Sequence, residues 1–105
     1  MSHPNPKFII NNGNLTMGHV EFHRELSRDH STTKGGGWFH LDKENKKLYL
    51  YDQSVDFGPC ARPDVQQAVT EGLLSPFLED FAIYFLETHS LETALERAGP
   101  ENQIK

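Results

Sequence analysis

Near the start of the chain, apolar residues typical of strands lie on both sides of an Asn-Gly pair. Lys7 to Ile10 is rich in strand formers, and Asn12-Gly13 is the dipeptide that a two-residue type I′ turn favours. The pattern therefore predicts a β-hairpin. With this turn, one apolar face continues across the pair of strands, and its cross-strand pairs are Phe8 with Met17 and Ile10 with Leu15.

The apolar positions change phase in the second of these strands. Leu15 and Met17 have odd numbers, whereas Val20 and Phe22 have even ones. A slip of one residue turns every side chain to the opposite face of a sheet. We therefore expect the strand to break or bulge near Gly18, a residue type that tolerates such a distortion.

A second hairpin follows a polar segment. Ser27 to Gly37 is poor in apolar residues and ends in three glycines, which predicts a mobile loop. Trp38 to Leu41 and Leu48 to Tyr51 then alternate strictly on either side of a charged turn at 42–47. Pairing these strands forms an apolar face from Phe39, Leu41, Leu48 and Leu50, and an opposite face from Trp38, His40, Tyr49 and Tyr51.

Helical spacing occurs twice in the second half of the chain. The first helix begins at Pro63, has Val65, Ala68 and Val69 on one side, and ends at Gly72 as its C′ residue. The second has Ser90 as its N-cap and ends before Gly99-Pro100. We expect the tail from Glu101 to Lys105 to fray.

An apolar run, Phe81 to Leu86, lies between these helices. We interpret it as a buried strand that follows one helical turn at Ser75 to Glu79. The predicted fold is α+β: two β-hairpins forming a mainly antiparallel sheet, followed by helix, strand and helix, in a single domain spanning residues 1–105. The order lacks the βαβ alternation of a parallel nucleotide-binding sheet.

Charge and composition argue against two classes of partner. Ten Lys and Arg residues against fifteen Asp and Glu residues give a formal charge of −5, which disfavours electrostatic binding to nucleic acid or anionic lipid. No apolar stretch approaches the roughly 18 residues of a membrane span, and the N-terminus has no signal-peptide pattern. With one cysteine the chain has no internal disulfide, and we expect a cytoplasmic protein.

Histidine and glutamate suggest a metal site as an alternative function. The candidate ligands are His19, Glu21, His23 and His40. On one strand His19 and His23 would lie about 13 Å apart, too far to share an ion, so the site needs His40 from a neighbouring strand. Such a chain would be a small metal-binding protein or metal-dependent enzyme. The competing interpretation is a solvated polar face of a strand.

Other segments with reactive residue types give weaker evidence of a function. Cys60 precedes a predicted helix start and lies close to Arg62, which would favour a thiolate, although an isolated cysteine is more often buried and inert. Lys34 precedes its glycines, whereas a phosphate loop requires the reverse order. Asp29-His30-Ser31 are chain neighbours and do not converge as a catalytic triad.

The aromatic face of the second hairpin is the strongest candidate for partner binding. It consists of Trp38, His40, Tyr49 and Tyr51, and amphipathic aromatic side chains are favoured at protein interfaces. The alternative is that a helix of the same chain covers this face. The sequence therefore predicts a small protein-interaction or accessory domain without a cofactor or a catalytic motif, whose partner is another protein or a second copy of itself.

Overall fold

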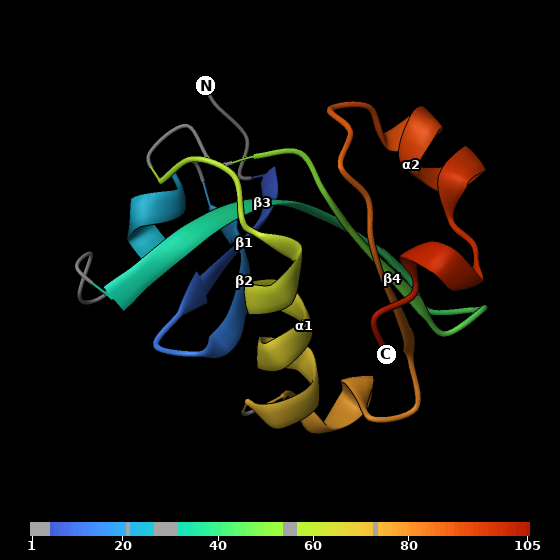
Figure 1. Cartoon of the computed structure of the whole chain (residues 1–105), viewed down its shortest axis with the longest axis horizontal. Helices are drawn as coiled ribbons and strands as arrows, with labels where there is room; N and C mark the ends of the chain where they lie inside the picture. The colour runs from blue at the N-terminus through green and yellow to red at the C-terminus, as the bar shows by residue number, and fades with distance from the viewer. Residues whose placement is uncertain (1–4, 21, 27–31, 54–56, 73) are drawn as a thin grey trace.

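The computed structural model describes residues 5–20, 22–26, 32–53, 57–72 and 74–105, and five strands form one sheet in the order β2-β1-β3-β4-β5 (Figure 1). The strands are β1 (Asn5–Asn11), β2 (Asn14–Val20), β3 (Thr33–Asp42), β4 (Lys47–Tyr51) and β5 (Ala82–Phe85). The helices are α1 (Arg62–Glu71) and α2 (Leu91–Arg97), with short 3₁₀ turns η1 (His23–Leu26), η3 (Pro76–Leu78) and η4 (Pro100–Asn102). This arrangement confirms the predicted α+β fold, with two hairpins followed by helix, strand and helix.

Both hairpins have the predicted register. Asn12 and Gly13 have φ values of 52° and 77°, as a type I′ turn requires, and Phe8 pairs with Met17. In the second hairpin Leu41 pairs with Leu48 and His40 with Tyr49. The two predicted faces of β3 and β4 are therefore confirmed.

The expected break at Gly18 is wrong. The pairing of β1 with β2 runs without interruption from Asn11 opposite Asn14 to Asn5 opposite Val20. The phase of the apolar residues changes because the chain leaves the sheet after Val20 and turns into η1. Gly18 serves another purpose, since a Cβ on it would lie 2.8 Å from Leu26 Cδ2. It lets η1 lie close against the sheet.

The prediction of a loop at Ser27 to Gly37 is also wrong for its described residues. Residues 27–31 lie outside the described part. Gly35, Gly36 and Gly37 belong to β3. A Cβ on Gly36 would lie 2.4 Å from the carbonyl oxygen of Phe8, and one on Gly37 would lie 2.4 Å from that of Tyr51. These glycines allow the backbones to approach closely, and they do not indicate flexibility.

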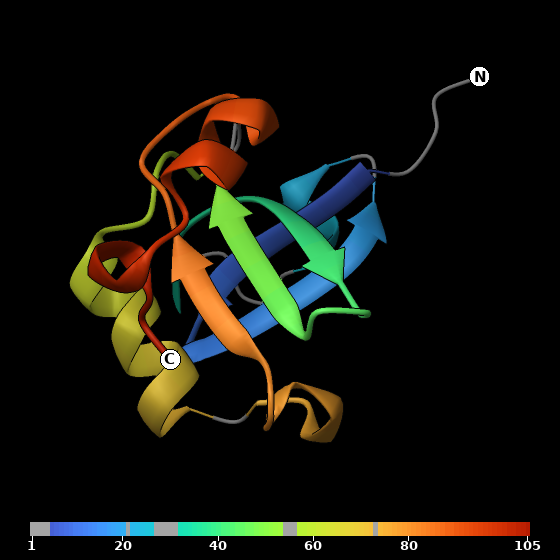
Figure 2. The same cartoon turned by 90° about the vertical axis from the view of Figure 1, so that its right-hand side faces the viewer.

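One pairing in the sheet is parallel, which the sequence analysis did not anticipate. β4 and β5 pair in parallel and are connected through α1, so the chain contains one β-α-β unit. Figures 1 and 2 show α1 and α2 on opposite sides of the sheet. Gly72 does follow α1, but its φ of −80° is not that of a left-handed C′ residue. A Cβ there would instead meet the Gly13 carbonyl oxygen at 2.4 Å.

The tail from Glu101 to Lys105 does not fray, contrary to expectation. After η4 it lies along β5, where the Ile104 N–H donates to the carbonyl oxygen of Ile83 at 2.8 Å and the Ile83 N–H donates to that of Lys105 at 2.9 Å. The Ile104 side chain is buried. The tail therefore covers the outer edge of β5, whose backbone groups would otherwise face solvent. The helix before it begins as predicted, because the Ser90 side chain accepts from the Thr93 N–H.

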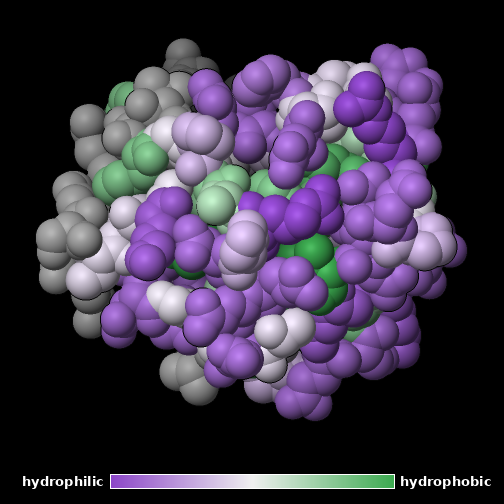
Figure 3. All heavy atoms as spheres, viewed as in Figure 1, coloured by the Kyte–Doolittle hydropathy of each residue, from purple (hydrophilic) through white to green (hydrophobic). Residues whose placement is uncertain are grey.

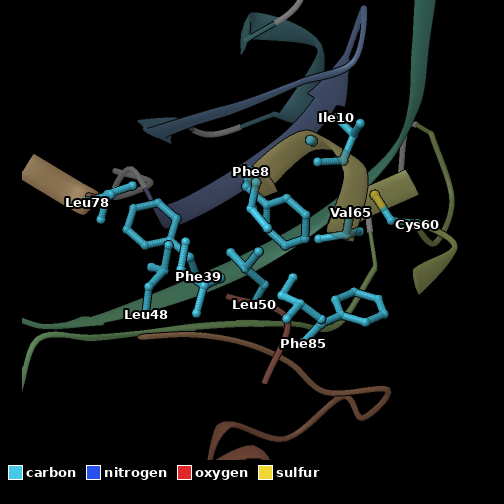
Figure 4. Packing of buried hydrophobic residues seen from close by; sticks show 13 residues of the cluster. Phe8, Ile10, Phe39, Leu48, Leu50, Cys60, Val65, Leu78 and Phe85 are labelled. Atoms are coloured by element: carbon cyan, nitrogen blue, oxygen red, sulfur yellow. The ribbon is translucent and has the colours of Figure 1, made fainter. Parts of the chain in front are cut away.

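Each face of the sheet carries its own apolar layer. On the α1 side, Phe8, Phe39 and Leu50 pack with Val65 and neighbouring residues (Figure 4). On the other side, the buried members of the layer are Tyr49, Tyr51, Tyr84, Leu86 and Ala94 of α2. Within the described ranges, every helix is too short or too polar to be a transmembrane segment.

Candidate functional site

Half of the predicted aromatic face is an internal layer. Tyr49 and Tyr51 are each only 7% exposed and pack in the cluster that contains Ala94 of α2. The Tyr49 ring stacks on that of Tyr84, with centroids 5.4 Å apart and planes 17° apart. Burial raises the pKa of both tyrosine hydroxyls above its ordinary value. The helix that the sequence analysis weighed as a cover is therefore present over these two side chains.

Trp38 and His40 form the outer part of the same face and are partly exposed. Trp38 lies opposite Lys7 of β1, whose Nζ is 5.5 Å from the centre of the indole ring and 6.0 Å from that of Phe22. Both distances suit a cation–π contact. The His40 ring is tilted against that of Tyr49 at 6.0 Å.

The structure places the metal candidates in different surroundings. His23 is buried, and its Nε2 donates to the carbonyl oxygen of Gly37 at 2.7 Å. His19 is exposed, with its ring edge-on to that of Phe39 at 5.5 Å. Glu21 lies outside the described residues. In the described part of the chain, no three His, Cys, Asp or Glu side chains gather as a metal site would require.

Cys60 is not an activated nucleophile in this structure. Burial raises the pKa of its thiol to about 12, so the group stays protonated near neutral pH. Arg62 does not bond to the thiol in the described structure; its Nη2 donates to the carbonyl oxygen of Phe85 and to Oδ1 of Asn102. The expectation that the start of α1 and Arg62 favour a thiolate is therefore wrong.

Two adjoining hollows form a largely apolar depression, which we call the Leu41 groove. One, of about 440 Å³, is lined by Leu41, Lys43, Phe77 and Phe81. The other, of about 340 Å³, is lined by Pro6, His19, Phe39, His40, Leu41 and Lys43. The two hollows share Leu41 and Lys43 in their linings, so they adjoin at these residues, and the name covers both.

Phenylalanine side chains at one end of the Leu41 groove reach solvent. Phe77 in η3 is 52% exposed, and its ring packs edge-on against that of Phe81 at 6.1 Å. The sequence analysis did not select these residues, because it assigned both to structural elements. The available signal was Pro76, which starts the short turn that carries Phe77.

Lys43 gives the Leu41 groove a positive charge. Asp80 pairs with Lys46 at 2.5 Å. Asp42 accepts hydrogen bonds from the backbone N–H and side chain of Asn45, which lower its pKa. Among the residues with described positions, no carboxylate lies within ion-pair distance of Lys43. Its ammonium group is thus available to a carboxylate from outside the chain.

A second, more polar groove lies between the β1–β2 turn and α1. It measures about 550 Å³, and its polar lining consists of Asn12, Asn14, Thr32, Lys34, Asp64, Gln67 and Glu71. Figure 3 shows the face that carries α1, where apolar surface is confined to small islands among polar residues. Ile10 is the one large apolar side chain among the described residues that line this second groove, so the groove offers little apolar surface to a protein partner.

Comparison of the chain with protein families, with curated proteins and with solved structures finds no match. Its function is therefore inferred from the geometry of the chain itself.

Proposed function

We propose that the chain is a small cytoplasmic protein-interaction domain that binds its partner in the Leu41 groove. The observation that carries this proposal is the exposed Phe77 ring, more than half open to solvent beside Phe81 and Leu41. Burial of an aromatic anchor in such a hollow is the usual source of binding energy at protein interfaces. The buried thiol of Cys60, the chain's one cysteine, is consistent with a reducing compartment.

The groove also suggests the chemistry of the partner. Lys43 stands between its two hollows, and His19 and His40 line one of them. A segment with an aliphatic or aromatic side chain next to a carboxylate would match both the apolar walls and the positive charge. We therefore propose an acidic, apolar segment of another protein as the occupant.

The aromatic face remains part of this proposal through its exposed members. His40 lines the Leu41 groove, and Trp38 lies two residues earlier on β3 with part of its side chain accessible. Trp38 shares its face of the sheet with His40, opposite the face that carries Phe39 and Leu41, so we propose that a bound partner continues past His40 onto the face of Trp38. In this arrangement Tyr49 and Tyr51 support the face from beneath α2.

Affinity capture from extracts of the native cell tests the proposal with two matched variants. Phe77→Ser removes the exposed ring of the groove, whereas Leu95→Ser removes a comparably exposed side chain, 44% accessible, from α2. We expect one set of proteins to bind the wild type and Leu95→Ser and to be lost with Phe77→Ser. Lys43→Glu should release the same set.

The thermal unfolding of both serine variants provides the folding control, and their midpoints should stay close to that of the wild type because both side chains are largely exposed. Capture of the same proteins by Phe77→Ser as by the wild type would rule out the groove as the binding surface.

A further inference from the structure

The two edges of the sheet differ in how the chain treats them. The outer edge of β5 is occupied by the tail, through the backbone hydrogen bonds between Ile83 and residues 104–105. β2 forms the other edge and pairs with β1 on one side. Among the described residues, no strand pairs with its other side. We propose that the β2 edges of two copies of this chain pair with each other in an antiparallel arrangement, joining two sheets across a two-fold axis.

The hairpin register identifies the backbone groups that such a pair would use. Asn11 and Asn14 flank the two-residue turn and form its hydrogen-bonded pair. In an antiparallel ladder the hydrogen-bonded pairs alternate with non-bonded ones, so Thr16 and Gly18 also bond to β1. The N–H and carbonyl groups of Leu15, Met17 and His19 consequently point away from β1, toward the open edge.

These outward residues are symmetric about Met17. Around a two-fold axis at that residue, Met17 pairs with Met17 of the second copy and Leu15 pairs with His19 of the second copy. Both kinds of pair named here are of the hydrogen-bonded type, in which the two residues exchange both bonds, and the non-bonded pairs of Thr16 with Gly18 lie between them. The same operation joins Leu15 and Met17, which are partly buried on the α1 side, to their counterparts in one apolar strip.

The composition of β2 favours a second copy as its partner. Edge strands that remain unpaired are usually protected by Lys, Pro, a bulge or short length. β2 spans seven residues, Asn14–Val20, in continuous register and contains no Asp, Glu, Lys, Arg or Pro. A chain with a formal charge of −5 thus has an uncharged edge, so two copies can meet there without apposing like charges.

Protonation of His19 does not oppose this register. It is the one titratable side chain on β2, and in the pair it faces Leu15. Four strand residues separate the positions that the two His19 side chains occupy, or about 13 Å along the strand. At that separation in water the repulsion between two imidazolium groups is weak.

Light scattering over a range of concentrations tests the pairing with a matched pair of variants at one position. His19→Pro removes an outward N–H at an edge where proline does not disturb the bonding to β1, whereas His19→Ala removes only the ring. We expect the mass of the wild type and of His19→Ala to rise from 12.0 kDa toward twice that value. His19→Pro should stay at the monomer mass with an unchanged circular dichroism spectrum.

Amide hydrogen exchange tests the register without a mutation. Exchange at Leu15, Met17 and His19 should slow at least tenfold on going from dilute to concentrated protein, while Thr16 and Gly18 should be protected at both concentrations. A monomer at every concentration would overturn the proposal and leave the edge to an extended segment of a different protein. A dimer in which these three amides exchange as in the monomer would overturn it too.

The inference does not depend on the proposed function. The Phe77→Ser variant alters the Leu41 groove and leaves β2 intact, so it should dimerise as the wild type does. A failure of the edge pairing and a failure of the groove therefore give different results.

Discussion

The Tyr49 ring lies flat against that of Tyr84, 5.4 Å from it between centroids, and this stack joins the parallel strands β4 and β5 on the side covered by α2. We expect Tyr49→Ser to lower the free energy of unfolding by about 3 kcal/mol, because it removes a large side chain from a packed layer. Tyr49→Phe keeps the ring and should cost less than about 1 kcal/mol. Urea unfolding measures both, and equal losses would show that the hydroxyl, and not the stack, matters.

Gly36 lies where two backbones come closest. A Cβ on this residue would lie 2.4 Å from the carbonyl oxygen of Phe8, and backbone cannot move aside as the end of a side chain can. We expect Gly36→Ala to destabilise the fold by about 3 kcal/mol. Gly99→Ala is the control, since its added Cβ would meet only the Arg97 carbonyl oxygen at 3.9 Å. A change of less than about 0.5 kcal/mol in thermal unfolding is expected for the control.

His23 anchors η1 to the sheet through its hydrogen bond to the Gly37 carbonyl oxygen. Replacing it by leucine keeps the apolar bulk and removes the donor, leaving a buried carbonyl without this partner. We expect a loss of about 2 kcal/mol in the free energy of unfolding by chemical denaturation. His23→Gln offers a donor of similar reach and should recover part of that loss. If the leucine variant is as stable as the wild type, the ring acts only by packing.

Stability should fall at alkaline pH. The Cys60 thiol has an ordinary pKa of 9.0, and burial raises it to about 12 in the folded chain. Well below pH 9 the thiol is neutral in both states and contributes no pH dependence. Between pH 9 and 12 the unfolded chain loses this proton while the folded chain keeps it, so the free energy of unfolding decreases as the pH rises. The raised pKa values of Tyr49 and Tyr51 act in the same direction.

Thermal unfolding from pH 8 to pH 11 measures this loss. Cys60→Ala is less stable overall because it removes a buried side chain, but its stability should depend less steeply on pH. A thiol reagent at pH 8 should modify wild-type Cys60 only after denaturant is added. Rapid modification of the folded protein would show that the thiol is accessible.

Local patterns were sufficient to predict most of the sheet. Asn12-Gly13 specifies its turn by backbone conformation alone, and the strict alternation around Leu41 and Leu48 specifies the register of the second hairpin. Ser90 is recognisable as a cap because its partner, Thr93, is close in the chain. Such signals need no knowledge of the rest of the fold.

The errors arose where the role of a residue depends on a contact with a residue far away in the sequence. From its sequence neighbours Gly36 is typical of a loop, and only its contact with Phe8 shows why glycine is needed there. Ile104 likewise lies in a sequence typical of a flexible tail, and only its hydrogen bond to Ile83 shows that it is ordered. The candidate site was predicted less well than the fold for the same reason. Tyr49 and His40 lie on the same face of the sheet, yet α2 covers only the tyrosine. The alternation of residues along a strand does not show where a later helix will lie.

The parallel pairing of β4 with β5 has a consequence for the order in which the chain folds. Each hairpin joins strands that are neighbours in the chain, so both can close early and independently. Leu48 of β4 and Ile83 of β5 are separated in the chain by the segment that contains α1. Bringing them together closes a long loop, which costs entropy before the new contacts form. Until then the apolar run from Phe81 to Leu86 stays uncovered, which makes it the segment through which partly folded chains would aggregate.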